Sequence, residues 1–105
     1  MLFVVNVRHR KTSRIIYNRA FNRLSTALRF GADVTMGRRT VIAEVYDQHG
    51  LISTLWTDSR KRFLWSPSEG EEPYSLAALY KFVADCEDVE RVKRAKNRHP
   101  TNSRS

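Results

Sequence analysis

The first thirty-two residues contain no Asp or Glu, although they contain seven Lys or Arg side chains. Because no nearby carboxylate neutralises these cations, this third of the chain is expected to attract anionic partners. Net charge is separated along the whole chain: it is +7 over residues 1–32, +1 over 33–65, −5 over 66–91 and +5 over 92–105. This separation predicts one or two positive faces and a negative one.

Cysteine and long apolar runs are also scarce. Cys86 is the only cysteine, so no intramolecular disulfide can form and stability must come from packing. No apolar run approaches the roughly 18 residues of a membrane span, and Met1 to Val5 is too short for a signal-peptide core. These features favour a soluble, cytoplasmic protein with no membrane partner. They fit one compact domain over residues 1–96 and a flexible basic tail over 97–105, which has little apolar surface.

Catalytic and metal-binding motifs are missing as well. No G-x-S-x-G nucleophile and no Gly-rich phosphate loop is present. Glu44 is not followed by the lysine of a Glu-x-Lys nuclease pair, and Cys86 lies on an apolar helix stripe typical of a core residue. The three histidines, His9, His49 and His99, are far apart in the sequence, and none has a second ligand at the spacing of a metal site. The sequence therefore predicts a protein that is not an enzyme and needs no metal or cofactor.

Two elements are predicted in the first third of the chain. Residues 2–8 alternate as a strand does. From Arg14 to Phe30, a helical projection gathers the apolar residues on a sector of about 140° and predicts a helix over 14–30, with Gly31 as its C-cap. The remaining arc of this helix carries Asn18 and Asn22 with Arg14, Arg19, Arg23 and Arg29.

The rest of the chain predicts a three-stranded meander followed by a second helix. The β-branched and aromatic segments 39–47 and 51–57 flank an Asp-Gln-His-Gly turn, and a reversal at 58–61 leads to a short strand over 62–65. A second helix begins near Pro73, with a buried stripe of Leu76, Leu79, Phe82, Val83 and Cys86. The predicted fold class is α+β, in the order β-α-β-β-β-α. The expected sheet is mainly antiparallel, with about four strands and two helices packed on one face.

The first candidate site is a basic surface for phosphates. It combines the turn over residues 8–14 with the polar face of the first helix, on which Arg19 and Arg23 are one helical turn apart. The alternative is a solvated helix face on a generally basic protein. The residues assigned to this surface are Arg8, Arg10, Lys11, Arg14, Arg19, Arg23 and Arg29.

The second candidate interleaves cations with aromatic rings on the sheet. Arg39, Arg60, Lys61 and Arg62 add to the phosphate-binding set, and Trp56 and Trp65 are candidates for stacking on bases. Ordinary core packing of the aromatic residues is the alternative. A third candidate is an acidic surface for a basic protein or for another copy of this chain, against the alternative of a solvated helix face. It comprises Glu69, Glu71, Glu72, Asp85 and Asp88.

Together these features predict a small, basic, non-enzymatic regulatory protein that binds nucleic acid, either DNA or RNA. An alternative from another class is a protein-interaction module, such as a small phage-type inhibitor that binds and blocks a host protein. The short length, the high charge and the absence of a catalytic or metal-binding motif are compatible with both functions. Salt-dependent binding to nucleic acid would distinguish the first from the second.

Overall fold

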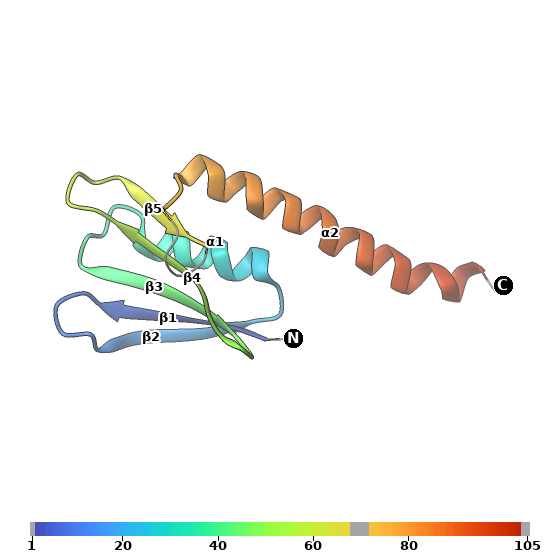
Figure 1. Cartoon of the computed structure of the whole chain (residues 1–105). Helices are drawn as coiled ribbons and strands as arrows, with labels where there is room; N and C mark the ends of the chain where they lie inside the picture. The colour runs from blue at the N-terminus through green and yellow to red at the C-terminus, as the bar shows by residue number, and fades with distance from the viewer. Residues whose placement is uncertain (1, 68–71, 104–105) are drawn as a thin grey trace.

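Five antiparallel strands form one sheet in the order β2-β1-β3-β4-β5 in the computed structural model of the chain (Figure 1). The structure describes residues 2–67 and 72–103, with residues 93–103 described by their backbone alone. The strands are β1 (Phe3–His9), β2 (Ile15–Phe21), β3 (Val41–Asp47), β4 (Gly50–Thr57) and β5 (Phe63–Ser66). Helix α1 (Leu24–Thr35) follows β2, and α2 (Leu76–Ser103) follows β5. The predicted α+β class is confirmed, with five strands where about four were expected.

The additional strand is β2, and it corrects the helix predicted over 14–30. Its apolar residues repeat at a spacing that also suits a helix, but the β-branched Ile15 and Ile16 favour extended backbone. Pairing with β1 places Tyr17 opposite Val7 and Phe21 opposite Phe3. The rings of Tyr17 and Phe21 then contact Phe30 of α1, at centroid distances of 5.7 and 5.2 Å. The apolar residues of the predicted helix are therefore divided between a strand and a helix, and on the strand Ile16 and Ala20 are exposed.

A turn without glycine joins β1 to β2. The backbone N–H of His9 donates to the carbonyl of Arg14 at 2.9 Å, and that of Ser13 donates to the carbonyl of His9 at 2.8 Å. Ser13 has φ 60°, in the left-handed region that usually selects Gly or Asn. Because the turn lacks its usual residues, the hairpin gave no clear signal in the sequence.

Both helices cover the same face of the sheet, and the core lies between them and the strands (Figure 1). Alternate residues of the strands point to this face, as a period of two requires. Helix α1 contributes small side chains and one leucine, which allow it to approach the sheet closely. The fully buried core residues are Val5, Ala27, Leu28, Ala32, Ala43, Val45, Leu55, Leu79 and Val83.

At Gly31, α1 lies close to the sheet. A Cβ at this position would lie 3.0 Å from Cδ1 of Leu55 on β4 and 3.5 Å from Cβ of Ala43 on β3. The helix continues past Gly31 to Thr35, so the prediction that this glycine caps the helix is wrong. Its role is packing: the helix and the strands approach too closely for a side chain.

Helix α2 packs against α1 and β5 through the predicted stripe. Leu79 and Val83 are fully buried, whereas Phe82 is 39% exposed. The helix extends past the sheet (Figure 1) and continues to Ser103, so it includes residues 97–103 of the segment predicted to be a tail. No helix in the described ranges combines the length and the apolar character needed to cross a membrane.

The other face of the sheet, which we call the open face, is not covered by any element in the described part of the chain. Arg8 of β1, Ile42 of β3, Trp56 of β4 and Leu64 of β5 form one row across it, as the registers of the three strand pairs require. Each of these four residues is half-buried by its neighbours in the sheet. The open face therefore combines apolar and polar side chains on a surface that reaches solvent.

Candidate nucleic-acid interface

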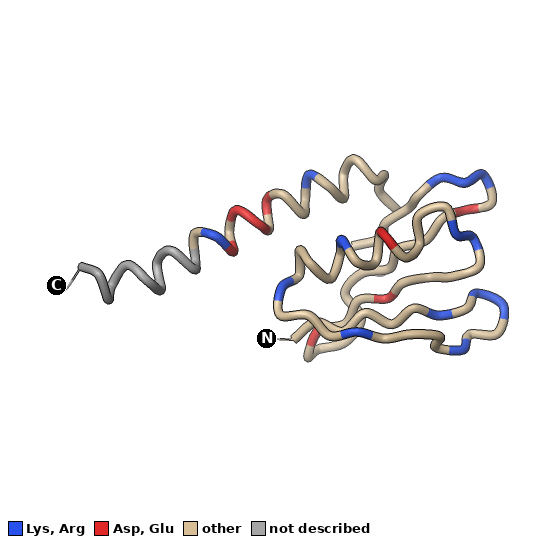
Figure 2. The backbone as a smooth tube through the Cα atoms, turned by 180° about the vertical axis from the view of Figure 1, so that it is seen from behind, with Lys and Arg blue, Asp and Glu red and all other residues tan. Residues whose placement is uncertain are grey.

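Three loops leave the sheet at the same end. The β1–β2 turn, the α1–β3 connection and the β4–β5 turn meet there because His9 pairs with Val41, Ile42 with Trp56, and Thr57 with Phe63. These loops contain a single acid, Asp58, and their cations gather at this end in Figure 2. We call this region the basic end; its eight cations, all exposed, are Arg10, Lys11, Arg14, Arg38, Arg39, Arg60, Lys61 and Arg62.

Arginine side chains hold the three loops together. One guanidinium nitrogen of Arg10, Nη1, donates to the carbonyl of Thr57 at 3.1 Å and to that of Arg39 at 3.3 Å. Arg39 Nη1 in turn donates to the carbonyl of Ser59 at 3.2 Å. Each of these guanidinium groups thus crosses from one loop to the next. The cations are held side by side despite their mutual repulsion.

Two buried threonines fix the base of the same region. Thr57, at the end of β4, donates from its hydroxyl to the carbonyl of Thr35 at the end of α1, at 2.7 Å. The backbone N–H of Arg38 donates to that same carbonyl at 3.0 Å. The hydroxyl of Thr35 donates to the carbonyl of Gly31 at 2.8 Å. The end of α1 and the loop that follows it are therefore fixed over the end of β4.

Asp58 organises the β4–β5 turn and neutralises one of its cations. Its Oδ1 accepts from the backbone N–H groups of Arg60 and Arg62, each at 2.9 Å, and its Oδ2 pairs with the guanidinium of Arg62. The backbone hydrogen bond from Arg62 is the largest of the causes that lower the pKa of Asp58, so the carboxylate stays ionised. Lys61 has φ 64° at the tip of the turn. Among the described residues, no carboxylate pairs with the side chain of Arg60 or Lys61.

Arg8 lies beside the basic end, on the open face, where it is paired. Its Nε donates to Oε1 of Glu44 at 3.0 Å, and the hydroxyl of Tyr46 donates to the same oxygen at 3.4 Å. The hydrogen bond to Glu44 is the first cause of the raised pKa of Arg8. Arg8 also donates to the carbonyl of Ser13 in the β1–β2 turn. Arg8 was predicted to contact phosphate, but its charge is already neutralised by Glu44.

The other three predicted cations lie away from the basic end. Arg19 is on β2 with its guanidinium carbon 5.2 Å from the ring centroid of Phe21, and Arg23 immediately precedes α1. They are not on one helical face, because only the second lies at a helix. Arg29 of α1 is paired with Glu87 of α2 through two hydrogen bonds of 3.0 Å. The predicted basic helix face is therefore wrong, and the structure divides its members among a turn, a strand and a helix.

The two tryptophans occupy different environments. Trp56 is half-buried on the open face, in the row nearest the basic end. Trp65 is 4% exposed, and its indole N–H donates to the hydroxyl of Ser53 at 3.3 Å. Of the two candidates for stacking, Trp65 is a core residue whose ring cannot reach a base in this conformation. Trp56 alone is accessible.

The acidic segment is partly used within the chain. Glu87 pairs with Arg29, and Oε1 of Glu90 accepts from the hydroxyl of Ser25 at 2.6 Å, so both carboxylates join α2 to α1. Neither was among the predicted acidic contacts. Glu72, Asp85 and Asp88 are exposed, and Asp88 pairs with Arg91 at 3.2 Å. Glu69 and Glu71 lie outside the described residues.

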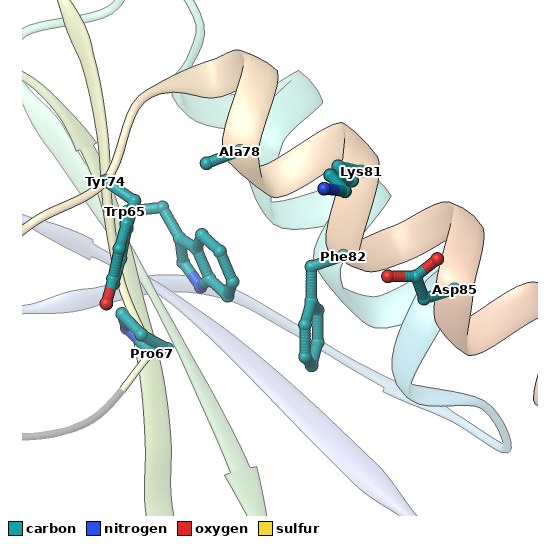
Figure 3. Close-up of a pocket in the computed structure, with 7 residues that line it drawn as sticks. All are labelled: Trp65, Pro67, Tyr74, Ala78, Lys81, Phe82 and Asp85. Atoms are coloured by element: carbon teal, nitrogen blue, oxygen red, sulfur yellow. The ribbon is translucent and has the colours of Figure 1, made fainter.

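A shallow cavity of about 340 Å³ lies between α2 and the end of β5 (Figure 3). The ring of Trp65 lies 5.2 Å from that of Phe82 and 5.8 Å from that of Tyr74, measured between centroids. The cavity is mainly apolar, which suits an apolar side chain better than a phosphate. Its lining residues are Trp65, Pro67, Tyr74, Ala78, Lys81, Phe82 and Asp85.

Metal-ligating side chains are dispersed over the described ranges. Within them no three His, Cys, Asp or Glu side chains are grouped to hold a metal ion. Burial, followed by the charges of Glu90 and nearby carboxylates, raises the pKa of the Cys86 thiol. A raised thiol pKa keeps the sulfur protonated and is the opposite of what a nucleophilic cysteine requires.

Comparison of the chain with models of protein families, with curated proteins and with solved structures finds no match. The site must therefore be interpreted from its own residues. Sequence reasoning missed Arg38 as a member. It also missed the grouping itself, which depends on β1, β3 and β4 being neighbours in the sheet. The only signal in the sequence was that each of the three connections contains adjacent cations.

Proposed function

We propose that the protein is a non-enzymatic regulatory protein that binds nucleic acid, DNA or RNA, through its basic end. The observation that carries the proposal is the meeting of three loops with eight cations and one acid at one end of the sheet. The single acid, Asp58, is already paired with Arg62. Seven exposed cations therefore have no carboxylate partner among the described residues, and a polyanion is the partner that would neutralise them together.

The width of the basic end supports contact with several phosphates. Five strands at about 4.8 Å apart span roughly 19 Å. Because phosphates of one duplex strand follow one another about every 3.4 Å of helix axis, this width extends past about five of them, so several can face the loops. Guanidinium groups suit such contacts because their forked donors bind phosphate oxygens in pairs. Arg10 and Arg39 are already oriented by their hydrogen bonds to the loops.

Binding measured across a salt series tests the proposal. Labelled duplex DNA, single-stranded DNA and RNA of about 16 nucleotides would be titrated by fluorescence anisotropy. With about five phosphate contacts, log K against log salt is expected to have a slope of roughly −4.5 on duplex DNA and roughly −3.5 on single strands. Absence of binding to all three at low salt would end the proposal.

Two double variants separate a local surface from overall charge. Arg60→Glu with Lys61→Glu reverses two unpaired cations of the basic end, and Arg19→Glu with Lys81→Glu makes the same change of charge elsewhere. We expect the first pair to weaken binding strongly and to reduce the magnitude of the duplex slope by about 1.8. The second pair is expected to have a much smaller effect. Equal losses would show that net charge, and not the basic end, governs binding.

A second candidate function is that of a protein-interaction module of the inhibitor type. It is favoured by the apolar cavity beside α2, where Tyr74 is 47% exposed and Phe82 is 39% exposed. A stoichiometric partner retained from a nuclease-treated lysate by the parent chain, lost with Phe82→Glu and kept with Val89→Glu, would support it. Loss of every partner on nuclease treatment would count against it.

A further inference from the structure

The open face and the basic end are continuous. Trp56 immediately precedes Thr57, whose carbonyl accepts the hydrogen bond from Arg10, so the indole ring belongs to a residue adjoining the fixed cations. On the open face, its row is the last before the three loops. An aromatic ring beside a line of cations is the arrangement that holds a base and its phosphate at once.

The remainder of the open face is close to neutral. Its pair of opposite charges, Arg8 and Glu44, is joined by a salt bridge of 3.0 Å. Beyond them, the register places Asn6 beside Asn18 and Glu44 beside Thr54, which adds uncharged groups able to hydrogen-bond. Phosphates are therefore attracted to the basic end, whereas the face itself suits uncharged base surfaces and edges.

The open face is too wide for the grooves of a duplex. The sheet is roughly 19 Å across five strands, whereas the major groove is about 12 Å wide and admits at most a two-stranded ribbon. Bases of a duplex would remain stacked and out of reach of Trp56. Unpaired bases can turn outward and stack on an aromatic side chain.

We propose that the basic end and the open face together form a site for single-stranded nucleic acid, with phosphates on the three loops and a base stacked on Trp56. This inference rests on the proposed function and specifies its substrate. It also explains a difference between the tryptophans. Trp65 is enclosed by the core, whereas Trp56 occupies a solvent-facing strand position where an aromatic ring contributes less to packing.

Three measurements on the intact chain test the inference. Affinity for a single-stranded 16-mer and for its duplex would be compared in the parent, in Trp56→Phe and in Trp56→Leu. Stacking on one base contributes roughly 1–3 kcal/mol, so Trp56→Leu is expected to weaken single-strand binding about 5- to 150-fold. Trp56→Phe keeps an aromatic face and is expected to lose much less. Thermal unfolding of each variant confirms that the chain is folded.

Intrinsic fluorescence provides an independent readout. Binding of the single strand is expected to quench the tryptophan fluorescence of the parent protein. This quenching is expected to disappear in Trp56→Phe, whose remaining tryptophan is the buried Trp65. If both Trp56 variants bind single strands as the parent does, and Arg60→Glu with Lys61→Glu weakens binding strongly, the stacking site is refuted while nucleic-acid binding stands. If the parent binds nothing at low salt, both proposals fall.

Discussion

The guanidinium group of Arg29 donates two hydrogen bonds of 3.0 Å to the carboxylate of Glu87, fifty-eight residues further along the chain. The first residue comes from the acid-free N-terminal segment and the second from the acidic segment. The pair joins α1 to α2, so part of the charge separation in the sequence is cancelled inside the fold. Most of the described cations that no salt bridge neutralises lie at the basic end.

The Arg29–Glu87 pair predicts a dependence of stability on pH. Hydrogen bonding to Arg29 lowers the pKa of Glu87 from its ordinary value of 4.5. A carboxylate with a lowered folded-state pKa stabilises the fold fully above its unfolded pKa, and the contribution is lost as pH falls through the folded value. Glu87→Gln is therefore expected to lower the urea midpoint modestly at pH 7, because both groups are partly exposed. The difference from the parent should disappear at the acidic end of a pH series.

Asp85→Asn is the control for that series, because it removes the same charge from the same helix without removing an ion pair of the described residues. Its urea midpoint is expected to stay close to that of the parent. A Glu87→Gln difference that persisted below the folded pKa of Glu87 would contradict the ion-pair explanation.

The left-handed backbone at Ser13 predicts that two substitutions there will differ in their effect on stability. A β-branched residue at φ 60° is strained, so Ser13→Val is expected to destabilise the protein by about 1–2 kcal/mol. Ser13→Gly removes the strain but adds freedom to the unfolded chain, and we expect a net change within about 0.5 kcal/mol. Urea unfolding measures both. Similar values for the two variants would be inconsistent with this turn and would favour a helix beginning nearby.

Thr57 predicts a measurable cost for losing one buried hydroxyl. Its side chain is 1% exposed and donates to the carbonyl of Thr35 at 2.7 Å. Thr57→Val retains the shape but removes the donor, and we expect a loss of about 1–3 kcal/mol in the free energy of unfolding. Thr54→Val is the matched control, three residues away on the half-buried open face of the same strand. It is expected to be nearly neutral, and an equal loss there would refute the role of the hydrogen bond.

Gly31 predicts coupling between α1 and β4. Alanine in a helix interior gains up to about 1 kcal/mol over glycine, but a Cβ here would meet the fully buried Leu55 at 3.0 Å. Overpacking costs about 1–3 kcal/mol, so Gly31→Ala is expected to destabilise by about 1 kcal/mol overall. The cost should be smaller in a Leu55→Val background, where a methylene has been removed. Additive effects in this double-mutant cycle would exclude the contact.

The sequence predicts the meander and the second helix because local signals identify both. The turn after Asp47 has its expected residues: the carboxylate accepts from the backbone N–H of His49 at 2.7 Å, and Gly50 has φ 125°. The β1–β2 hairpin lacks comparable residues, so periodicity alone decided its assignment. Ile16, Ala20 and Leu24 are spaced as a helix requires, but the pairing of β2 with β1, interrupted only at Ile16, outweighs that local preference.

The candidate site could be predicted by residue type but not by position. Arg10, Arg39 and Arg60 were identified from the sequence as cations, yet their proximity depends on strand order, which joins segments about twenty to fifty residues apart. A helix over 14–30 would display Arg23 and Arg29 on the same surface as the turn before it. The observed fold places them near the carboxylates of α2 instead.

The hydrogen bonds of Arg10 and Arg39 to loop carbonyls have a thermodynamic consequence. A mobile arginine side chain loses rotamer entropy when it is immobilised by a ligand. These two side chains are already ordered by folding, and each guanidinium keeps further N–H donors for a second acceptor. Their preorganisation transfers the entropic cost from association to folding. An anion that binds would then meet two guanidinium groups that are already oriented. Most of the side-chain entropy lost on binding would come from the other cations of the basic end.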